Sequence, residues 1–149
     1  MREDMGNLWT YPANAIVITT NGFVKKNGEA VMGRGCAREA AIRYPDLPEK
    51  LGNSLNISGN KVFHFWIREH ILTMPVKHNW WEKADIELIK ESANQLIEHA
   101  DGWDFKTIVC PRPGCGNGQL DWEDVKPILS EIWDDRFVAL DYKKEIGEI

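Results

Sequence analysis

The segment FKTIVCPRPGCGNGQLDWEDVKPILSEIW, from Phe105 to Trp133, holds three successive patterns that decide the fold class. Residues Phe105 to Pro111 include a short apolar run, which predicts a buried strand. Residues Trp122 to Trp133 have helical spacing, and we expect Asp124 to cap this helix because Pro127 then falls in the first turn, where proline is tolerated. A loop with glycines at alternate positions joins the two. A strand, a glycine-rich loop and a helix in this order are typical of an α/β domain.

The N-terminal third of the chain repeats this arrangement. Asn14 to Gly22, NAIVITTNG, predicts a buried strand, and VMGRGCAREAAIRYP follows from Val31 to Pro45. We expect a helix over Cys36 to Tyr44, which Pro45 ends because proline disfavours helical geometry in the residue before it. Glycine-rich turns before helices expose backbone N–H groups that bind anions. Neither loop has the full Walker or dinucleotide-binding pattern, so plain turn glycines are the alternative.

The rest of the chain alternates in the same way. Lys61 to Ile67 and Glu69 to Val76 predict two adjacent antiparallel strands, Lys83 to Ala100 predicts an amphipathic helix, and Arg136 to Tyr142 predicts a last strand. We therefore expect a three-layer α/β fold with a mostly parallel sheet, in one domain over residues 1–149. Both glycine loops then lie at the carboxyl ends of strands, where such sheets bind ligands.

Composition restricts the function and the compartment. A formal net charge of −5 argues against broad binding to a nucleic-acid backbone, although recognition of a single nucleotide remains compatible with it. Cys36, Cys110 and Cys115 have no CxxC spacing and predict reduced thiols. The N-terminus lacks a signal-peptide pattern and no apolar run reaches about 20 residues, so we expect a cytoplasmic protein with no membrane partner. The histidines lack metal-ligand spacing, and we expect neither a metal nor a cofactor.

Several motifs together resemble the macrodomain family, whose members bind ADP-ribose. These motifs are MGNLW, TNG, VMGRGCA, PVKHNWW and PRPGCGNGQLDWEDVKPIL. The chain is similar to the phage and bacterial branch that includes proteins processing ADP-ribose 1''-phosphate and DNA ADP-ribosyl glycohydrolase antitoxins. The resemblance extends from Met5 to the last strand. It implies a three-layer α/β/α sandwich with a mixed central sheet, in which the two glycine loops enclose the diphosphate and distal ribose of ADP-ribose.

The resemblance also implies roles for individual residues. Asn7 stands beside the adenine where many relatives have an aspartate, and Asn21 matches an asparagine that faces the distal ribose. Arg34 lies in the first phosphate loop, where it either reaches a phosphate or points to solvent. The residues expected to bind the ligand are Asn7, Leu8, Asn21, Gly33, Arg34, Gly35, Cys36, Ala37, Gly114, Cys115, Gly116, Asn117 and Gly118.

The chain departs from the catalytic pattern of some relatives. In glycohydrolases that use a lysine, the resemblance places that lysine on the helix after the first loop, near Ala41, and this helix contains no lysine. The second-loop aspartate of other relatives corresponds to Gly118. These departures disfavour covalent lysine chemistry and leave Asn21 and His78 as the candidate catalytic residues. The unperturbed pKa of histidine suits acid–base catalysis, and a surface histidine is the alternative for His78.

Three functions are compatible with these residues. The favoured one is an enzyme that hydrolyses a substituent of the distal ribose, as an ADP-ribose 1''-phosphate phosphatase does. The alternatives are a non-catalytic module that reads or sequesters ADP-ribose, and an ADP-ribosyl glycohydrolase that acts on modified DNA or protein. The expected partner is ADP-ribose or a derivative, with nucleic acid only if it is ADP-ribosylated. Trp80 and Trp81 either pack a helix start or stack on a base.

Overall fold

The structure is a computed structural model and describes residues 1–141. Tyr142, the last residue of the final predicted strand, lies outside the described residues. The elements in chain order are β1 (Arg2–Met5), β2 (Ala15–Asn21), α1 (Gly35–Arg43), α2 (Leu47–Ser58), β3 (Phe63–Trp66), β4 (His70–Lys77), α3 (Ile86–Trp103), β5 (Ile108–Pro111), the 3-10 turn η1 (Gly116–Gly118), α4 (Trp122–Ile132) and β6 (Phe137–Asp141). Within residues 1–141, no helix is long and apolar enough to cross a membrane.

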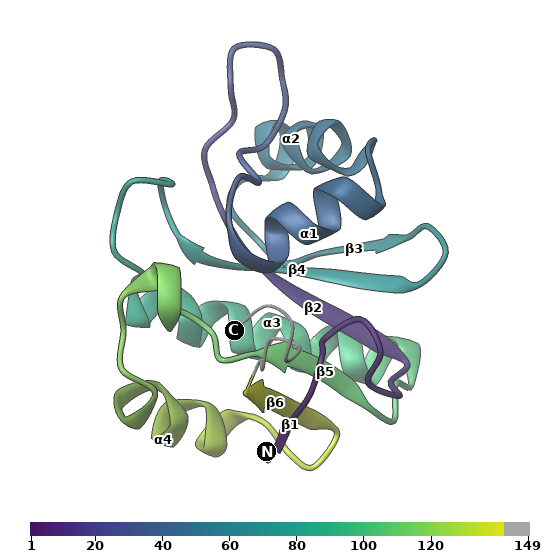
Figure 1. Cartoon of the computed structure of the whole chain (residues 1–149), viewed down its shortest axis with the longest axis vertical. Helices are drawn as coiled ribbons and strands as arrows, with labels where there is room; N and C mark the ends of the chain where they lie inside the picture. The colour runs from purple at the N-terminus through teal and green to yellow at the C-terminus, as the bar shows by residue number, and fades with distance from the viewer. Residues whose placement is uncertain (142–149) are drawn as a thin grey trace, which may run out of the picture.

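One mixed sheet with the strand order β1-β6-β5-β2-β4-β3 forms the middle layer. Every neighbouring pair is parallel except β3 and β4, which are antiparallel as expected. Helices α1 and α2 cover one face of the sheet, and α3 and α4 cover the other (Figure 1). The predicted three-layer α/β/α sandwich is therefore confirmed. Because β2, β4, β5 and β6 are parallel, their carboxyl ends lie at one edge of the sheet.

Strand β2 shows how a continuous apolar run serves both faces. Ala15 and Val17 belong to the core beneath α3 and α4, whereas Ile16 and Ile18 belong to the core beneath α1 and α2. Alternate side chains of a strand point to opposite faces, so the part of a central parallel strand that lies between two helix layers is apolar at successive positions. This pattern made the strand predictable from the sequence.

Two elements were missed in the sequence. All four residues of β1 are exposed and three of them are charged, so the segment has no apolar strand pattern. It forms a strand because β6 offers a parallel edge. Helix α2 buries Leu47, Leu51 and Leu55 at four-residue spacing. Its glycine, asparagine and serine residues have low helix propensity and concealed this stripe.

The predicted cap of α4 was wrong. The helix begins at Trp122, and the carbonyl of Asp121 accepts from the backbone N–H groups of Asp124 (3.0 Å) and Val125 (3.2 Å), so Asp121 is the cap residue. Pro127 consequently lies inside the helix. It removes the N–H that would bond the carbonyl four residues earlier, and both positions are on the exposed face, where water can satisfy that carbonyl.

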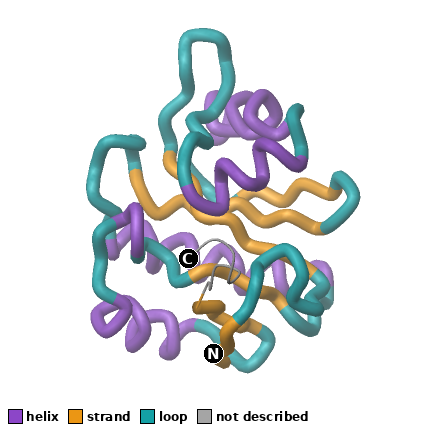
Figure 2. The backbone as a smooth tube through the Cα atoms, viewed as in Figure 1, coloured by secondary structure: helices purple, strands orange, loops and turns teal. Residues whose placement is uncertain are grey.

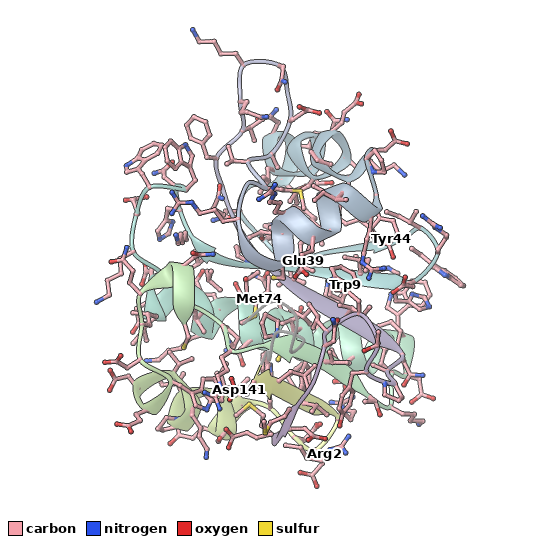
Figure 3. All side chains as sticks on the ribbon, in the orientation of Figure 1. Arg2, Trp9, Glu39, Tyr44, Met74 and Asp141 are labelled. Atoms are coloured by element: carbon pink, nitrogen blue, oxygen red, sulfur yellow. The ribbon has the colours of Figure 1, made fainter. Side chains whose placement is uncertain are left out.

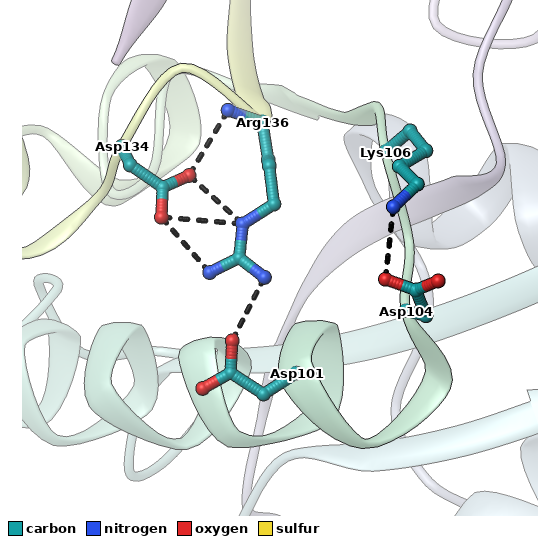
Figure 4. A network of polar contacts seen from close by, with 5 residues as sticks. All are labelled: Asp101, Asp104, Lys106, Asp134 and Arg136. Atoms are coloured by element: carbon teal, nitrogen blue, oxygen red, sulfur yellow. Dashed lines mark hydrogen bonds and ion pairs between the residues drawn. The ribbon is translucent and has the colours of Figure 1, made fainter.

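Arg136 joins the segment before β6 to the end of α3 (Figure 4). Its guanidinium donates to Asp134 through Nε and Nη2, both at 2.9 Å, and to Asp101 through Nη1 at 2.8 Å. Hydrogen bonding to Arg136 lowers the pKa of the Asp134 carboxyl below its ordinary value. The network fixes the turn that leads into β6.

Removing this guanidinium with Arg136→Gln should lower the free energy of unfolding by about 0.5–1 kcal/mol at neutral pH, because the carboxylates are largely solvent-exposed. A carboxyl with a lowered folded pKa stabilises the fold above its unfolded pKa of about 4, and this contribution is lost as the pH falls through the folded pKa. Urea titrations should therefore show the difference between wild type and variant shrinking below about pH 4. Lys106→Gln breaks the more exposed ion pair with Asp104 and should change the free energy of unfolding little. An equal loss of stability in both variants would contradict the argument.

Candidate functional site

A cavity of about 810 Å³ opens at the carboxyl edge of the sheet. Its wall consists of the ends of β2, β4, β5 and β6, the start of α1, and the long loops that gather at this edge (Figure 2). Ligand pockets commonly have volumes of about 300–1,000 Å³, so a nucleotide-sized molecule fits. All of the residues expected to bind the ligand line the cavity except Asn7; the placed residues are Leu8, Asn21, Gly33, Arg34, Gly35, Cys36, Ala37, Gly114, Cys115, Gly116, Asn117 and Gly118.

The N-terminus of α1 is bare and faces this cavity. Arg34 precedes the helix with an extended backbone, and no side chain caps the first turn. The first turn contains no acidic residue, and its first three residues, Gly35, Cys36 and Ala37, line the cavity. The first N–H groups of a helix have no intrahelical acceptor and carry the positive end of its dipole. This wall of the cavity is therefore suited to bind an anion.

The two glycine loops approach each other at Gly35 and Asn117. Gly35 has a φ of +57°, and a Cβ atom there would lie 3.2 Å from the Asn117 Nδ2. The second loop is fixed from the other side, since the backbone N–H of Ala84 donates to the carbonyl of Gly118 at 3.0 Å. The loops thus form two walls of one cavity, as their sequence positions predicted.

Lys77, the last residue of β4, brings an amine into the cavity. Its Nζ donates to the carbonyl oxygens of Asn117 (3.1 Å) and Trp80 (3.4 Å). Desolvation, together with the positive charge of Arg34, lowers the pKa of this amine below its ordinary value. A lysine that deprotonates more easily is suited to acid–base or nucleophilic chemistry.

The backbone of Lys77 is held at an irregularity in the sheet. The register shifts between Thr20 and Asn21, so that Asn21 pairs with Lys77. The Asn60 Nδ2, from the segment between α2 and β3, donates to the Lys77 carbonyl at 3.0 Å. These contacts fix the point at which β4 leaves the sheet and its lysine enters the cavity.

Asn21 lies in the cavity wall with its carboxamide oriented by the chain itself. Its Nδ2 donates to the carbonyl of Val31 at 3.1 Å, and its Oδ1 accepts from the backbone N–H of Phe23 at 2.9 Å. A carboxamide has two N–H groups and two acceptor lone pairs, so one of each remains for a ligand. The same contacts tie the start of the first loop to β2.

His78 and Asn7 do not line the cavity. Lys77 is the last residue of β4 and lines the cavity, whereas His78 follows it in the loop toward α3. His78 is exposed, and its Nε2 lies 2.8 Å from the Oδ2 of Asp85, the cap residue of α3. The Asn7 Oδ1 accepts from the backbone N–H of Trp9 at 2.8 Å. The structure thus places both side chains in local turns and helix caps.

The N-terminal loop is positioned against α1 by aromatic packing. Trp9 lies beside Tyr44 (Figure 3), with the ring centres 6.4 Å apart. The Arg43 guanidinium lies 4.6 Å from the centre of the Trp9 ring. This packing holds Leu8 in the cavity wall. Glu39 of α1 also lines the cavity and adds a carboxylate that the sequence analysis did not select.

The surroundings of the loop cysteines favour the thiol over the thiolate. The Cys36 Sγ lies 3.4 Å from the backbone nitrogen and from the Oγ1 of Thr19, and burial raises its pKa. Burial also raises the pKa of Cys115 and of Cys110. A raised pKa opposes nucleophilic chemistry, and these side chains act as small packing groups.

Lys77 is the functional candidate that sequence reasoning missed. The lysine was sought on the helix after the first loop, near Ala41, whereas the structure brings one from the end of a neighbouring strand. A signal was present, because Lys77 directly follows the apolar run of a predicted strand. Its significance depended on β4 lying parallel to β2, so that both strands end at the cavity.

Known proteins are similar to this chain in sequence and in fold. The family profile named Macro domain matches residues 37–129. The DNA ADP-ribosyl glycohydrolase of Thermus aquaticus is 25% identical over 139 residues, which cover 88% of this chain and 37% of that protein. The corresponding protein of Mycobacterium tuberculosis is 29% identical over 132 residues, covering 83% of this chain and 36% of that protein. The chain thus spans little more than a third of the length of these curated relatives.

Solved structures give the same result. The macrodomain of Mycobacterium tuberculosis DarG superposes with a TM-score of 0.80 at 25% identity and covers 97% of each chain. Thermosipho africanus DarTG, solved in complex with ADP-ribose, shares the fold with a TM-score of 0.81 at 18% identity, covering 97% of this chain and 42% of that chain. Because the family profile matches well over half of the residues, this chain belongs to the macro domain family.

Proposed function

We propose that residues 1–149 form one macrodomain that binds ADP-ribose and hydrolyses its bond to an ADP-ribosylated nucleic acid. The observation that carries this proposal is the amine of Lys77, which lies in the cavity beside the bare start of α1 with a lowered pKa. The names of the relatives, DNA ADP-ribosyl glycohydrolases, support the choice of substrate.

The anion-binding features support a position for the diphosphate. Two phosphates would accept hydrogen bonds from the first N–H groups of α1 and from the glycine loops, with the dipole of the helix favouring their charge. The distal ribose would then extend toward Asn21 and Lys77, which are paired in the sheet register. Hydrolysis adds water across the bond between C1'' of this ribose and the nitrogen of a base. The C1''–O bond forms, the C1''–N bond breaks, and the leaving nitrogen takes a proton.

Lys77 can serve this reaction by two routes. As a general acid, its ammonium donates the proton to the leaving nitrogen and recovers one from the attacking water. As a nucleophile, its free amine attacks C1'' and displaces the base, whose nitrogen takes the proton that the amine loses. The C1''–O4'' bond of the ribose then opens to give an iminium, which water hydrolyses to free ADP-ribose and the amine. Reduction with borohydride traps a covalent ligand adduct only on the second route, which mass spectrometry would detect on the peptide that contains Lys77.

The test is release of free ADP-ribose from a single-stranded oligonucleotide that carries ADP-ribose on a base. We expect release by the wild-type chain and tight binding of the product. ADP-ribose binding without release would support the alternative of a non-catalytic reader. Absence of both would overturn the proposal.

A phosphatase that acts on ADP-ribose 1''-phosphate is the second candidate. Arg34 and Lys77 both line the cavity, and the charge of Arg34 is close enough to lower the pKa of Lys77. A phosphate group on the distal ribose would bind between these two cations and relieve their repulsion. Release of inorganic phosphate from ADP-ribose 1''-phosphate, measured on the same preparation, decides between the two substrates.

Replacing Gly35 with valine should weaken ADP-ribose binding by about 100-fold or more, which corresponds to about 2.7 kcal/mol. A β-branched residue is strained at the positive φ of Gly35, and its side chain would meet the Asn117 amide. Both effects displace the start of α1 from the second loop. Titration calorimetry measures the affinity.

Gly102→Ala is the matched control for this variant. Gly102 lies in α3, and a Cβ there meets no atom within 4 Å, so affinity should stay at the wild-type value. If Gly35→Val left the affinity for ADP-ribose unchanged, the diphosphate would have to bind elsewhere.

A further inference from the structure

Three aromatic side chains form a surface at the mouth of the cavity, which we call the aromatic platform. It consists of Trp80 and Trp81 from the loop between β4 and α3, and Phe23 from the loop between β2 and α1. The rings of Trp80 and Trp81 lie 5.4 Å apart and nearly perpendicular, and Phe23 meets Trp81 edge-on at 5.5 Å. Both loops leave the sheet at the edge where β2 and β4 end (Figure 1).

The two tryptophans of the platform do not belong to either core. Trp80 is 47% exposed and Trp81 is 58% exposed, whereas the core residues on both faces of the sheet are at most 7% exposed. Packing of the helix start, one of the two roles considered for this pair, therefore leaves much of both rings in water. Exposed aromatic rings next to a ligand cavity offer surface for stacking.

The platform lies at the Lys77 end of the cavity. Trp80 lines the cavity, and its carbonyl accepts from the Lys77 Nζ at 3.4 Å. A group attached to a ribose that is held at Lys77 would therefore leave the cavity past Trp80. Trp81 stands outside the cavity lining, one ring farther along the same path.

The two loops that carry the platform also carry cations. Lys26, Lys83 and Arg34 are exposed and have no ion-pair partner within residues 1–141. The carboxylates of the same loops are held by local contacts, Glu29 with Lys25 at 3.6 Å, Glu82 with the Asn79 amide at 2.7 Å, and Asp85 with His78 at 2.8 Å. Lys26, Lys83 and Arg34 are thus the cations of these loops that have no ion pair among the described residues and that can contact a phosphate backbone.

We propose that the aromatic platform binds the unpaired bases of the nucleic-acid strand that carries the ADP-ribose. This inference rests on the proposed function and adds the residues that would recognise the group beyond the distal ribose. Aromatic side chains stack on bases of any sequence, but only where the base face is free, so the platform selects a single strand over a duplex. Trp80 is the first stacking partner, Trp81 extends the surface, and the three free cations guide the backbone.

The test compares the affinity of an ADP-ribosylated single-stranded oligonucleotide with that of free ADP-ribose. Both are measured by titration calorimetry in the Lys77→Ala background, so that turnover does not consume the ligand. We expect the strand to bind roughly tenfold more tightly than free ADP-ribose, and a modified duplex to lose this advantage. Trp81→Ala should abolish most of the advantage while the affinity for free ADP-ribose stays the same, because Trp81 is outside the cavity lining. Trp80→Phe, which keeps an aromatic face, should retain most of it.

Trp66→Ala is the matched control. Trp66 is 65% exposed and ends β3, where it pairs with His70 at the start of β4, far along that strand from Lys77; its ring lies 4.3 Å from the His70 ring at a tilt of 32°. Equal affinities for the strand and for free ADP-ribose, or an equal loss in Trp66→Ala and Trp81→Ala, would overturn the platform. Failure to bind free ADP-ribose would instead overturn the proposed function. If Trp81→Ala loses the tighter binding of the modified strand, the platform is supported even if the wild type releases no ADP-ribose.

Discussion

Replacing Lys77 with alanine is expected to reduce the rate of ADP-ribose release by about 100- to 10,000-fold, the range typical for removal of an acid–base group. The affinity for ADP-ribose should change far less, since the start of α1 and the glycine loops remain in place. Single-turnover release and product titration, measured on one preparation, separate the two effects. A wild-type rate in Lys77→Ala would exclude this amine from the reaction.

The pH dependence of release tests the same residue more sharply. Desolvation and Arg34 lower the pKa of Lys77, so the limb of the pH–rate profile that reports this amine should lie below the ordinary lysine value of about 10.4. The rate rises through that limb if the free amine is the nucleophile, and falls through it if the ammonium is the acid. Arg34→Ala removes the neighbouring charge and should move the limb to higher pH.

Two controls accompany these measurements. Lys77→Arg keeps a positive charge that does not titrate in this range. This variant should bind free ADP-ribose but should cleave ADP-ribose slowly from the modified oligonucleotide. Lys26→Ala removes an exposed lysine that does not line the cavity, and this variant should release ADP-ribose from a modified mononucleoside at the wild-type rate. A comparable loss of release in both alanine variants would point to general electrostatics instead of the chemistry of one amine.

Gly52→Ala is expected to lower the free energy of unfolding by at least about 3 kcal/mol, at the upper end of the range for overpacking. Gly52 lies in α2, where the segment between β2 and α1 crosses the helix. A Cβ atom there would lie 1.9 Å from the Gly28 carbonyl oxygen and 3.0 Å from the Ala30 nitrogen. These are backbone atoms, and the Ala30 N–H is already bonded to the Pro48 carbonyl at 2.9 Å. The added methyl group therefore separates helix and loop.

Urea denaturation of wild type and Gly52→Ala measures this loss, with Gly102→Ala as the control. Both substitutions gain intrinsic helix propensity, and the site at Gly102 is open, so the control should be neutral or slightly stabilising. A loss below about 1 kcal/mol in Gly52→Ala would mean that the loop yields easily. The expected loss of stability would show that the contact of Gly52 with Gly28 and Ala30 holds the first glycine loop over α1 and α2.

Local sequence patterns were sufficient for much of the fold. The apolar runs of β2, β4 and β5 predicted strands, and the stripes and stop signals of α1 and α3 predicted helices. Their alternation predicted the α/β class and placed both glycine loops at strand ends, where they line one cavity. These features depend on interactions between residues close in sequence, and they could therefore be predicted from a single sequence. Helix α2 and the start of α4 were not predicted correctly. The weak helix formers of α2 are compensated by packing, and the proline of α4 is tolerated because of solvent exposure.

The identity of the candidate catalytic group was decided only by the tertiary structure. The order of the strands and their pairing, in which Asn21 lies opposite Lys77, bring a lysine from β4 into the cavity, whereas His78, one residue later, is exposed at the surface. The sequence determined the layers of this protein and the two loops, because strand, helix and turn preferences act over a few residues. Which side chains meet between those loops was set by pairing of segments distant in the chain, since strand order and the direction of a side chain at a strand end depend on long-range packing.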